Sequence, residues 1–393
     1  MKETNPNFDF YSFNEKTEQD VTPAEEKTVE PATEEVAQLV EEATTAPAGE
    51  PVDEQAAAAP SVDTALLKSK MKNGYSHVGW AFVAVTFAWF FLTIMLQVFA
   101  SVAAPWLYDT YWFEIVSGTL PLYVVCTPLL FLIVQGAQKA QVEKKKLSVP
   151  HFFMLLLIAE GIMVVGSLIG NGLMSTVSLL TGNDFENQLN SAFEIPIWLS
   201  FAFTVVLAPI FEELIFRKLL LDRMLPYGEF CAILINGILF GAFHGNFFQF
   251  FYAAMLGVLL SFVYVKTGKL RHCILIHMCV NFLGGIVPTL LYDWLGYDRM
   301  LALMNDEQAL AEYIGEHILP YFATMAYSAF QYGCAIAGAI VLILNLKKIK
   351  LRRTEDTLSN KEGLGAAFKN SGMIAALVVC GLLFVMSLFT SAA

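Results

Sequence analysis

Hydrophobic residues fall in long runs, separated by short polar segments, over most of the chain. A transmembrane helix needs about 20 mostly apolar residues, and nine such runs follow one another after residue 76. They cover residues 77–104, 115–136, 152–180, 195–223, 230–245, 247–265, 272–295, 319–346 and 373–392. The fifth run is short, and the sixth follows it almost directly. The pattern predicts an all-α polytopic membrane protein with about nine transmembrane helices.

The beginning of the chain has a different composition. The first 63 residues contain 16 acidic residues against three lysines, a net charge of −13, whereas the remainder carries +1. With few large apolar residues, this segment cannot bury a core, so we expect a disordered acidic tail. The predicted parts are a tail at 1–75, a membrane domain at 76–346, a basic loop at 347–372 and a final transmembrane helix at 373–393.

Lysine and arginine gather in alternate loops, and short loops rich in these residues face the cytoplasm. This places the N-terminus and five basic loops on the cytoplasmic side. The basic segments are Lys68, Lys70 and Lys72, "KAQVEKKK", Lys218 and Arg223, Lys266, Lys269 and Arg271, and "KKIKLRR".

The fourth run ends in "FEELIFRKLL", with three charged residues inside an apolar helix. Glu213 and Arg217 are four residues apart, so they share a helix face and can pair. Glu212 is turned about 100° from its neighbour and has no partner on its own helix. Such a carboxylate needs a partner elsewhere, a proton or a chemical role. A buried ion-pair cluster that fixes helix packing is the structural alternative.

Two later runs carry polar residues at helical spacing. The fifth run places Asn236, Phe240 and His244 at intervals of four, and the seventh places His277 and Asn281 four apart. Taken singly, each histidine is as well explained as a buried packing residue. Counted from the predicted interfaces, however, these groups and Glu212 lie within roughly 10 Å of one another in depth. We therefore expect one buried polar site.

This set of groups favours hydrolysis. A buried glutamate can act as general base towards water, and a neutral histidine can hold that water or bind a metal. A histidine–asparagine pair can donate hydrogen bonds to an oxyanion. Together they predict a hydrolase acting on an acyl bond, most simply a peptide bond.

Three motifs, taken in order, resemble those of the CAAX protease and bacteriocin-processing (CPBP) family. This family of intramembrane endopeptidases includes the type II CAAX prenyl endopeptidase and the bacterial Abi proteins. The resemblance covers about residues 195–295. The motifs are Glu212-Glu213-x-x-x-Arg217, Phe240-x-x-x-His244 and His277-x-x-x-Asn281.

The resemblance implies a role for each motif residue. Glu212 would be the general base, and His244 would help to hold the attacking water. His277 and Asn281 would stabilise the oxyanion. Glu213 and Arg217 would support Glu212.

The motifs leave the metal open. We favour a site that requires no cofactor, and the alternative is a divalent metal such as zinc held by Glu212, His244 and His277. The expected partners are membrane lipid and a membrane-associated or lipidated peptide or protein, not nucleic acid. The expected location is a bacterial plasma membrane.

Two other functions would use the same residues. A membrane immunity protein, of the kind linked to bacteriocins, could hold a peptide without cleaving it. A proton-coupled transporter could use the cluster as a proton relay. Glu160 in the third run fits none of the motifs; it is expected either to support Arg217 or to belong to such a relay.

Overall fold

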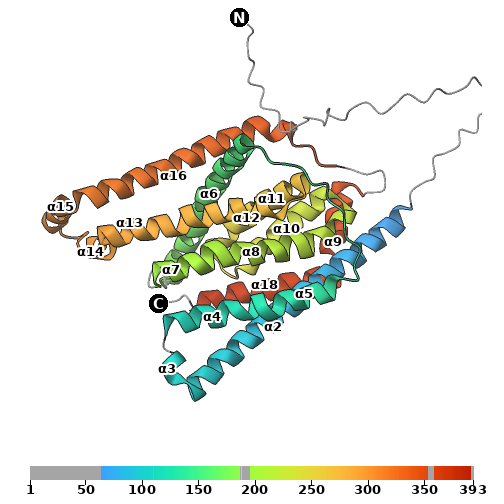
Figure 1. The fold of residues 1–393 in the computed structure, drawn as a ribbon, viewed down its shortest axis with the longest axis horizontal. Coiled ribbons are helices and arrows are strands. Elements are labelled where there is room, and N and C mark those ends of the chain that lie inside the picture. Colours follow the sequence, from blue (N-terminus) through green and yellow to red (C-terminus); the bar gives the residue numbers. More distant parts are fainter. Residues whose placement is uncertain (1–62, 109, 186, 188–194, 353–357, 391–393) are drawn as a thin grey trace, which may run out of the picture. The chain divides into compact units, whose positions relative to one another are not determined.

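The computed structural model describes residues 63–108, 110–185, 187, 195–352 and 358–390. The elements in these ranges are helices (Figure 1). They are α2 (Thr64–Ala103), α3 (Pro105–Tyr108), α4 (Tyr111–Pro121), η2 (Leu122–Cys126), α5 (Thr127–Val134), α6 (Val149–Thr181), α7 (Ile197–Ser200), η4 (Phe201–Leu207), α8 (Ala208–Glu213), η5 (Leu214–Leu221), α9 (Asp222–Met224), η6 (Leu225–Tyr227), α10 (Glu229–Phe243), α11 (Phe247–Thr267), α12 (Leu270–Asn281), η7 (Phe282–Ile286), α13 (Val287–Leu295), α14 (Tyr297–Ala302), α15 (Glu307–Glu316), α16 (Ile318–Asn345), η8 (Leu346–Lys348), α17 (Asn360–Phe368) and α18 (Ser371–Thr390).

Eight helical segments of the described chain are long and apolar enough to cross a membrane. They correspond to eight of the nine predicted runs. The remaining run forms α10, which has 15 residues and is shorter than a full span. The prediction of an all-α polytopic membrane protein is confirmed, and the count of nine is approximate.

Two predicted boundaries differ from the structure. Helix α2 begins at Thr64, about three turns before the predicted start of the membrane domain, and buries Met71 and Tyr75 on the way. The basic loop predicted at 347–372 contains α17, whose N-terminus is capped by Ser359. Both segments are too polar to be recognised as spans, yet each has small or apolar residues on one face. The tail at 1–62 lies outside the described residues.

Helix α11 packs closely against helices on two sides. A Cβ atom at Gly241 of α10 would lie 2.7 Å from the backbone nitrogen of Ala254, so only glycine allows this approach. On the other side, a Cβ atom at Gly170 of α6 would lie 2.7 Å from the carbonyl oxygen of Phe248. Helices α10 and α11 form an antiparallel pair. An ion pair joins Glu229 at the start of α10 to Lys266 at the end of α11.

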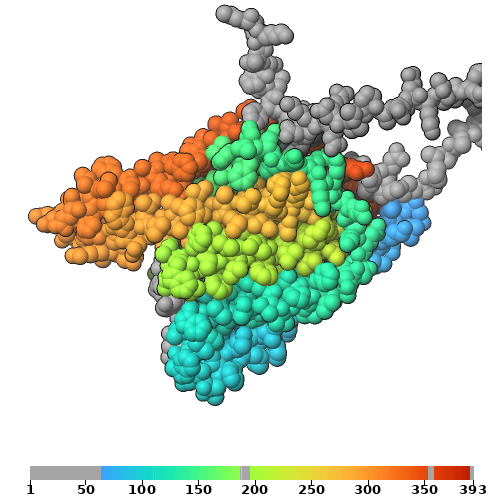
Figure 2. All heavy atoms as spheres, in the orientation of Figure 1, coloured from blue at the N-terminus to red at the C-terminus, as the bar shows by residue number. Residues whose placement is uncertain are grey.

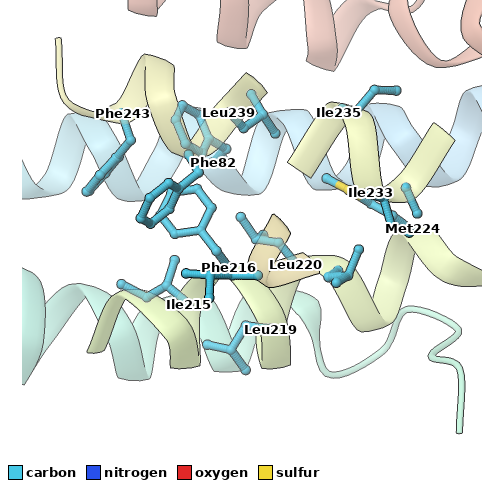
Figure 3. Packing of buried hydrophobic residues seen from close by; sticks show 14 of the residues in the cluster. Phe82, Ile215, Phe216, Leu219, Leu220, Met224, Ile233, Ile235, Leu239 and Phe243 are labelled. Carbon is cyan, nitrogen blue, oxygen red and sulfur yellow. The ribbon is translucent and has the colours of Figure 1, made fainter. Parts of the chain in front are cut away.

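An aromatic cluster joins this pair to the fourth span (Figure 3). Phe243 of α10 makes edge-to-face contacts with Phe216 of η5 at 5.4 Å and with Phe82 of α2 at 6.0 Å between ring centres. Because Phe216 is fully buried, it anchors the helix that carries the acidic motif. The motif residues are therefore held on a packed helix.

On the face in Figure 2, three membrane-crossing segments lie side by side in the order α4–α5, α7–η5 and α12–α13. Each of these segments contains π-helical turns: η2 lies between α4 and α5, η4 and η5 lie on either side of α8, and η7 lies between α12 and α13. Such turns inside α-helices occur frequently at functional sites. Here η4 and η5 flank α8, which ends in Glu212 and Glu213, and η5 contains Arg217. The segment η7 directly follows Asn281.

Candidate active site

Glu212 and Glu213 end α8, a stretch of six α-helical residues between two π-helical segments. The adjacent carboxylates have very different surroundings. The side chain of Glu213 is completely enclosed, whereas that of Glu212 is 16% exposed. The structure therefore separates one enclosed carboxylate from one that a small molecule such as water can reach.

Glu213 and Arg217 form the predicted ion pair. The guanidinium donates from Nε to one carboxylate oxygen at 2.9 Å and from Nη2 to the other at 3.3 Å. Its Nη1 donates to the Asn236 side-chain oxygen at 2.7 Å, and Ser261 donates to the same oxygen at 3.0 Å. A two-point contact of this kind is among the stronger hydrogen-bonded pairs. It holds both charges in an apolar interior by satisfying their hydrogen bonds.

His277 connects the two glutamates. Its Nδ1 atom lies 3.0 Å from Oε1 of Glu213, and its Nε2 atom lies 3.9 Å from Oε2 of Glu212. Because the ionised Glu213 can only accept, the Nδ1 atom carries the proton of this hydrogen bond. The Nε2 atom is thereby turned towards Glu212.

Phe240 lies among the charged and aromatic groups of the cluster. The guanidinium of Arg217 is 4.8 Å from the centre of its ring. The ring also makes edge-to-face contacts with His244 at 5.3 Å and with His277 at 5.7 Å. One phenyl ring thus separates the two histidines and borders both.

His244 caps the end of α10 with a fixed ring orientation. Its Nδ1 atom lies 2.9 Å from the carbonyl oxygen of Phe240, which can only accept a hydrogen bond. The Nδ1 atom is therefore the donor, and a neutral ring presents the lone pair of Nε2.

Asn281 reaches across to the fourth span. Its side-chain nitrogen donates to the carbonyl oxygen of Thr204 in η4 at 2.8 Å. A carboxamide nitrogen has two hydrogens, so this contact leaves one for another acceptor. The six predicted site residues lie on α8, η5 and α12 and at the C-cap of α10. All of them except Asn281 are linked by direct contacts or through Phe240.

Three further residues border the cluster without belonging to the predicted set. Ser261 supports Asn236, and Tyr123 and Tyr252 interact electrostatically with the Glu212 carboxylate. Tyr123 also stacks on Phe211, with ring centres 4.3 Å apart. In the sequence they are single hydroxyl-bearing residues in apolar helices, and no spacing rule links them to the motifs.

The alternative of a zinc site does not fit this arrangement. Within the described part of the chain, histidine, cysteine, aspartate and glutamate form no group of three placed to hold a metal ion. Glu212, His244 and His277 are therefore not placed to hold a metal ion together. The chemistry proposed below therefore passes through no metal.

One of the two roles expected for Glu160 was to support Arg217, and the structure does not place it there. Its neighbours are Tyr327 and Cys334 of α16 and Cys279 of α12, all of which interact electrostatically with it. Its Oε1 atom is buried and has no hydrogen-bond partner among the described residues. Arg217 is instead satisfied by Glu213 and Asn236, because these groups lie on its own helix and on the adjoining α10.

The fold and the site together define an integral membrane protein with a buried glutamate–histidine cluster. Residues 194–283 match the family described as type II CAAX prenyl endopeptidase Rce1-like. The chain thus carries a domain of the CAAX protease family within its membrane helices. The matched range contains all six predicted site residues and covers less than a quarter of the chain. No curated protein and no solved structure matches the chain.

Proposed function

We propose that the protein is an intramembrane endopeptidase that hydrolyses a peptide bond in a membrane-associated or lipidated peptide or protein. One observation supports this most strongly. The accessible carboxylate of Glu212 stands beside Nε2 of His277, whose other ring nitrogen is held by the enclosed Glu213. This is the arrangement of a base beside an oriented histidine.

In the proposed reaction, Glu212 takes a proton from a water molecule as the water oxygen attacks the carbonyl carbon. The lone pair of Nε2 on His244 accepts the second hydrogen of the water and so fixes its direction. When the carbon–nitrogen bond breaks, the protonated Glu212 returns its proton to the departing amine. General acid–base help of this kind typically contributes about 10²–10⁴ in rate.

Asn281 and His277 act on the carbonyl oxygen. The free hydrogen of the Asn281 carboxamide donates to the developing oxyanion. His277 donates from Nε2 when its ring carries both protons, with the Nδ1 proton still directed at Glu213. The Glu213–Arg217 pair acts through His277 as a positioning group, because both charges are enclosed and neither side chain can reach substrate.

The proposal includes orientation and location. The N-terminus and the basic loops face the cytoplasm, as the distribution of lysine and arginine predicts, and the membrane is a bacterial plasma membrane. The substrate reaches the site from within the bilayer or from its surface.

The test compares membrane peptides from cells carrying wild type and Glu212→Gln at equal protein levels. We expect peptide fragments that appear with wild type and are missing with the variant. Identical profiles, together with an unchanged cellular phenotype, would instead favour a protein that binds a peptide without cleaving it.

A further inference from the structure

A second group of charged residues surrounds a pocket far along the sequence from the CAAX-family segment. The pocket lies between the first turns of α2 and helix α17. Four of its six lining residues are lysines and one is acidic. The lining residues are Lys68, Lys72, Lys361, Glu362, Gly365 and Lys369.

The spacing of these residues explains the pocket. Lys361 and Gly365 are four residues apart and share one face of α17, and Lys369 follows as the C-cap residue of that helix. Lys68 and Lys72 are likewise four residues apart on α2. Gly365 has no side chain to fill the space between them, and a Cβ atom there would meet no atom within 4 Å.

Helix α17 is fixed in this orientation by its opposite face. Gly363, Ala366 and Ala367 are buried, and a Cβ atom at Gly363 would lie 2.9 Å from the sulfur of Cys231 in α10. Close packing of these small residues holds the pocket-lining face of α17 away from the helix bundle.

The acidic residue of the pocket is already engaged. The Ser359 hydroxyl donates to Oε2 of Glu362 at 2.6 Å. This hydrogen bond, with a contribution from the charge of Lys68, holds the pKa of Glu362 below its usual value. Glu362 stays ionised, and the pocket keeps an excess of three positive charges at neutral pH.

The depth of the pocket relative to the membrane can be inferred from α2 and α18, whose apolar parts begin beside it. Ser371 starts α18 two residues after Lys369, and its hydroxyl lies 3.1 Å from that of Ser76. Lys72 precedes Ser76 by one helical turn, about 6 Å. Trp80 donates to the Ser371 hydroxyl at 3.3 Å and is half exposed, as is typical of tryptophan at a membrane surface. The lysines therefore stand where the apolar helices begin, at the level of lipid headgroups.

We propose that this pocket binds the phosphate of an anionic phospholipid headgroup, in the leaflet on the side where α2 begins. Four lysine side chains, from α2 and from α17 with its C-cap residue, line a space left open by Gly365, and the ammonium groups at their ends can bind phosphate as point charges. The adjoining apolar helices provide surface for the acyl chains. This site does not depend on the proposed peptidase activity.

The test is native mass spectrometry of the purified full-length protein with added lipid. The probes are phosphatidylglycerol and phosphatidylcholine with the same acyl chains, and inorganic phosphate. We expect retention of phosphatidylglycerol over phosphatidylcholine, weakened about fivefold for each pocket lysine removed. This loss is measured in Lys72→Gln and in Lys369→Gln. The matched control is Lys70→Gln, which removes a positive charge from α2 at a residue that does not line the pocket.

A pocket-filling variant keeps the test decisive if a lysine variant fails to fold. Gly365→Leu places a side chain in this space, where its Cβ atom meets no atom within 4 Å, and should abolish the lipid preference without lowering thermal stability. Equal retention of both lipids by wild type, or equal losses in Lys70→Gln and Lys72→Gln, would overturn the proposal. Saturation by inorganic phosphate without any lipid preference would also overturn it.

The acidic N-terminal segment, with its net charge of −13, is the competing occupant. A photo-crosslinking residue placed at position 365 of the full chain distinguishes the two. Capture of phospholipid in membranes supports the proposal. A crosslink to a peptide from residues 1–62 overturns it in favour of the chain's own tail.

Discussion

Two glutamates are buried among the membrane helices, and their surroundings contrast. Glu213 accepts two hydrogen bonds from Arg217 and one from His277. Glu160 is almost as deeply buried, yet its Oε1 atom has no hydrogen-bond partner in the described chain. One carboxylate sits in a saturated network and the other does not.

The contrast shows what a membrane protein gains from buried charge. A saturated network can keep an ionised carboxylate in an apolar interior and use it to orient a neighbouring histidine. An unpaired carboxylate is tolerated there in its neutral form. Helix α12 lies between the two environments, with His277 and Asn281 towards the first and Cys279 towards Glu160.

Breaking the saturated network should have the largest effect. Arg217→Met leaves the enclosed Glu213 without its counter-ion, and removing one partner of a buried pair costs about 3–5 kcal/mol. That is a large part of a typical protein's stability. We expect little folded protein after extraction, measured by size-exclusion chromatography and thermal unfolding in detergent. Arg271→Met, which removes an exposed arginine, should behave like wild type.

A double variant separates stability from positioning. Glu213→Leu combined with Arg217→Leu removes both charges, so folded protein should return. Cleavage should stay absent, because His277 has lost the acceptor of its Nδ1 proton. Recovery of cleavage in this variant would contradict the role given to Glu213.

Removing a proposed oxyanion donor should act on the rate alone. We expect Asn281→Ala to lower kcat about 10²–10³-fold, as for other oxyanion donors, with little change in KM or thermal stability. Cys279→Ala is the control, since it lies on the same helix towards Glu160. A rate loss of the same size in both variants would show that any substitution on α12 lowers the rate. It would contradict the role of Asn281 as an oxyanion donor.

Removing the hydrogen bond between Arg217 and Asn236 should lower stability moderately. Asn236→Ala leaves the Nη1 group of Arg217 without its acceptor, and an unsatisfied buried group costs about 1–3 kcal/mol. We expect a lower unfolding temperature and a nearly normal rate in the folded fraction. Asn345→Ala should change the unfolding temperature less, because that amide donates within its own helix to Val341.

Neutralising the unpaired carboxylate should have the smallest effect. Glu160→Gln preserves shape and leaves the Glu212 site untouched, so we expect cleavage within about twofold of wild type and a stability change below about 1 kcal/mol. Function lost in this variant, with the Glu212 site intact, would favour a proton relay and hence a transporter.

Much of the fold could be predicted because membrane helices are set by long apolar runs. The predictions were wrong where helices are polar. The first turns of α2 carry lysines, and α17 is held by Gly363 and Ala366, whose packing has no strong signature in the sequence. The short α10 was detected as a run, but the length of its helix depends on where His244 ends it.

The pairing of Glu213 with Arg217 could be predicted because it lies within one helix and obeys the spacing of four. Contacts between helices could not. That His277 would bond Glu213 rather than Glu212 depends on how α12 is rotated against α8. The sequence likewise gave no reason to place Tyr123 or Ser261 near the cluster, or Glu160 away from it.

The central claim is that Glu212 is the base of a peptidase, and one reconstitution tests it directly. Purified wild type or Glu212→Gln is incorporated into vesicles with membrane proteins from cells lacking this chain, and new peptide termini are identified by mass spectrometry. We predict new termini with wild type and none with Glu212→Gln, although both proteins unfold at the same temperature. The same new termini at similar rates from both proteins, or none from either, would contradict the account.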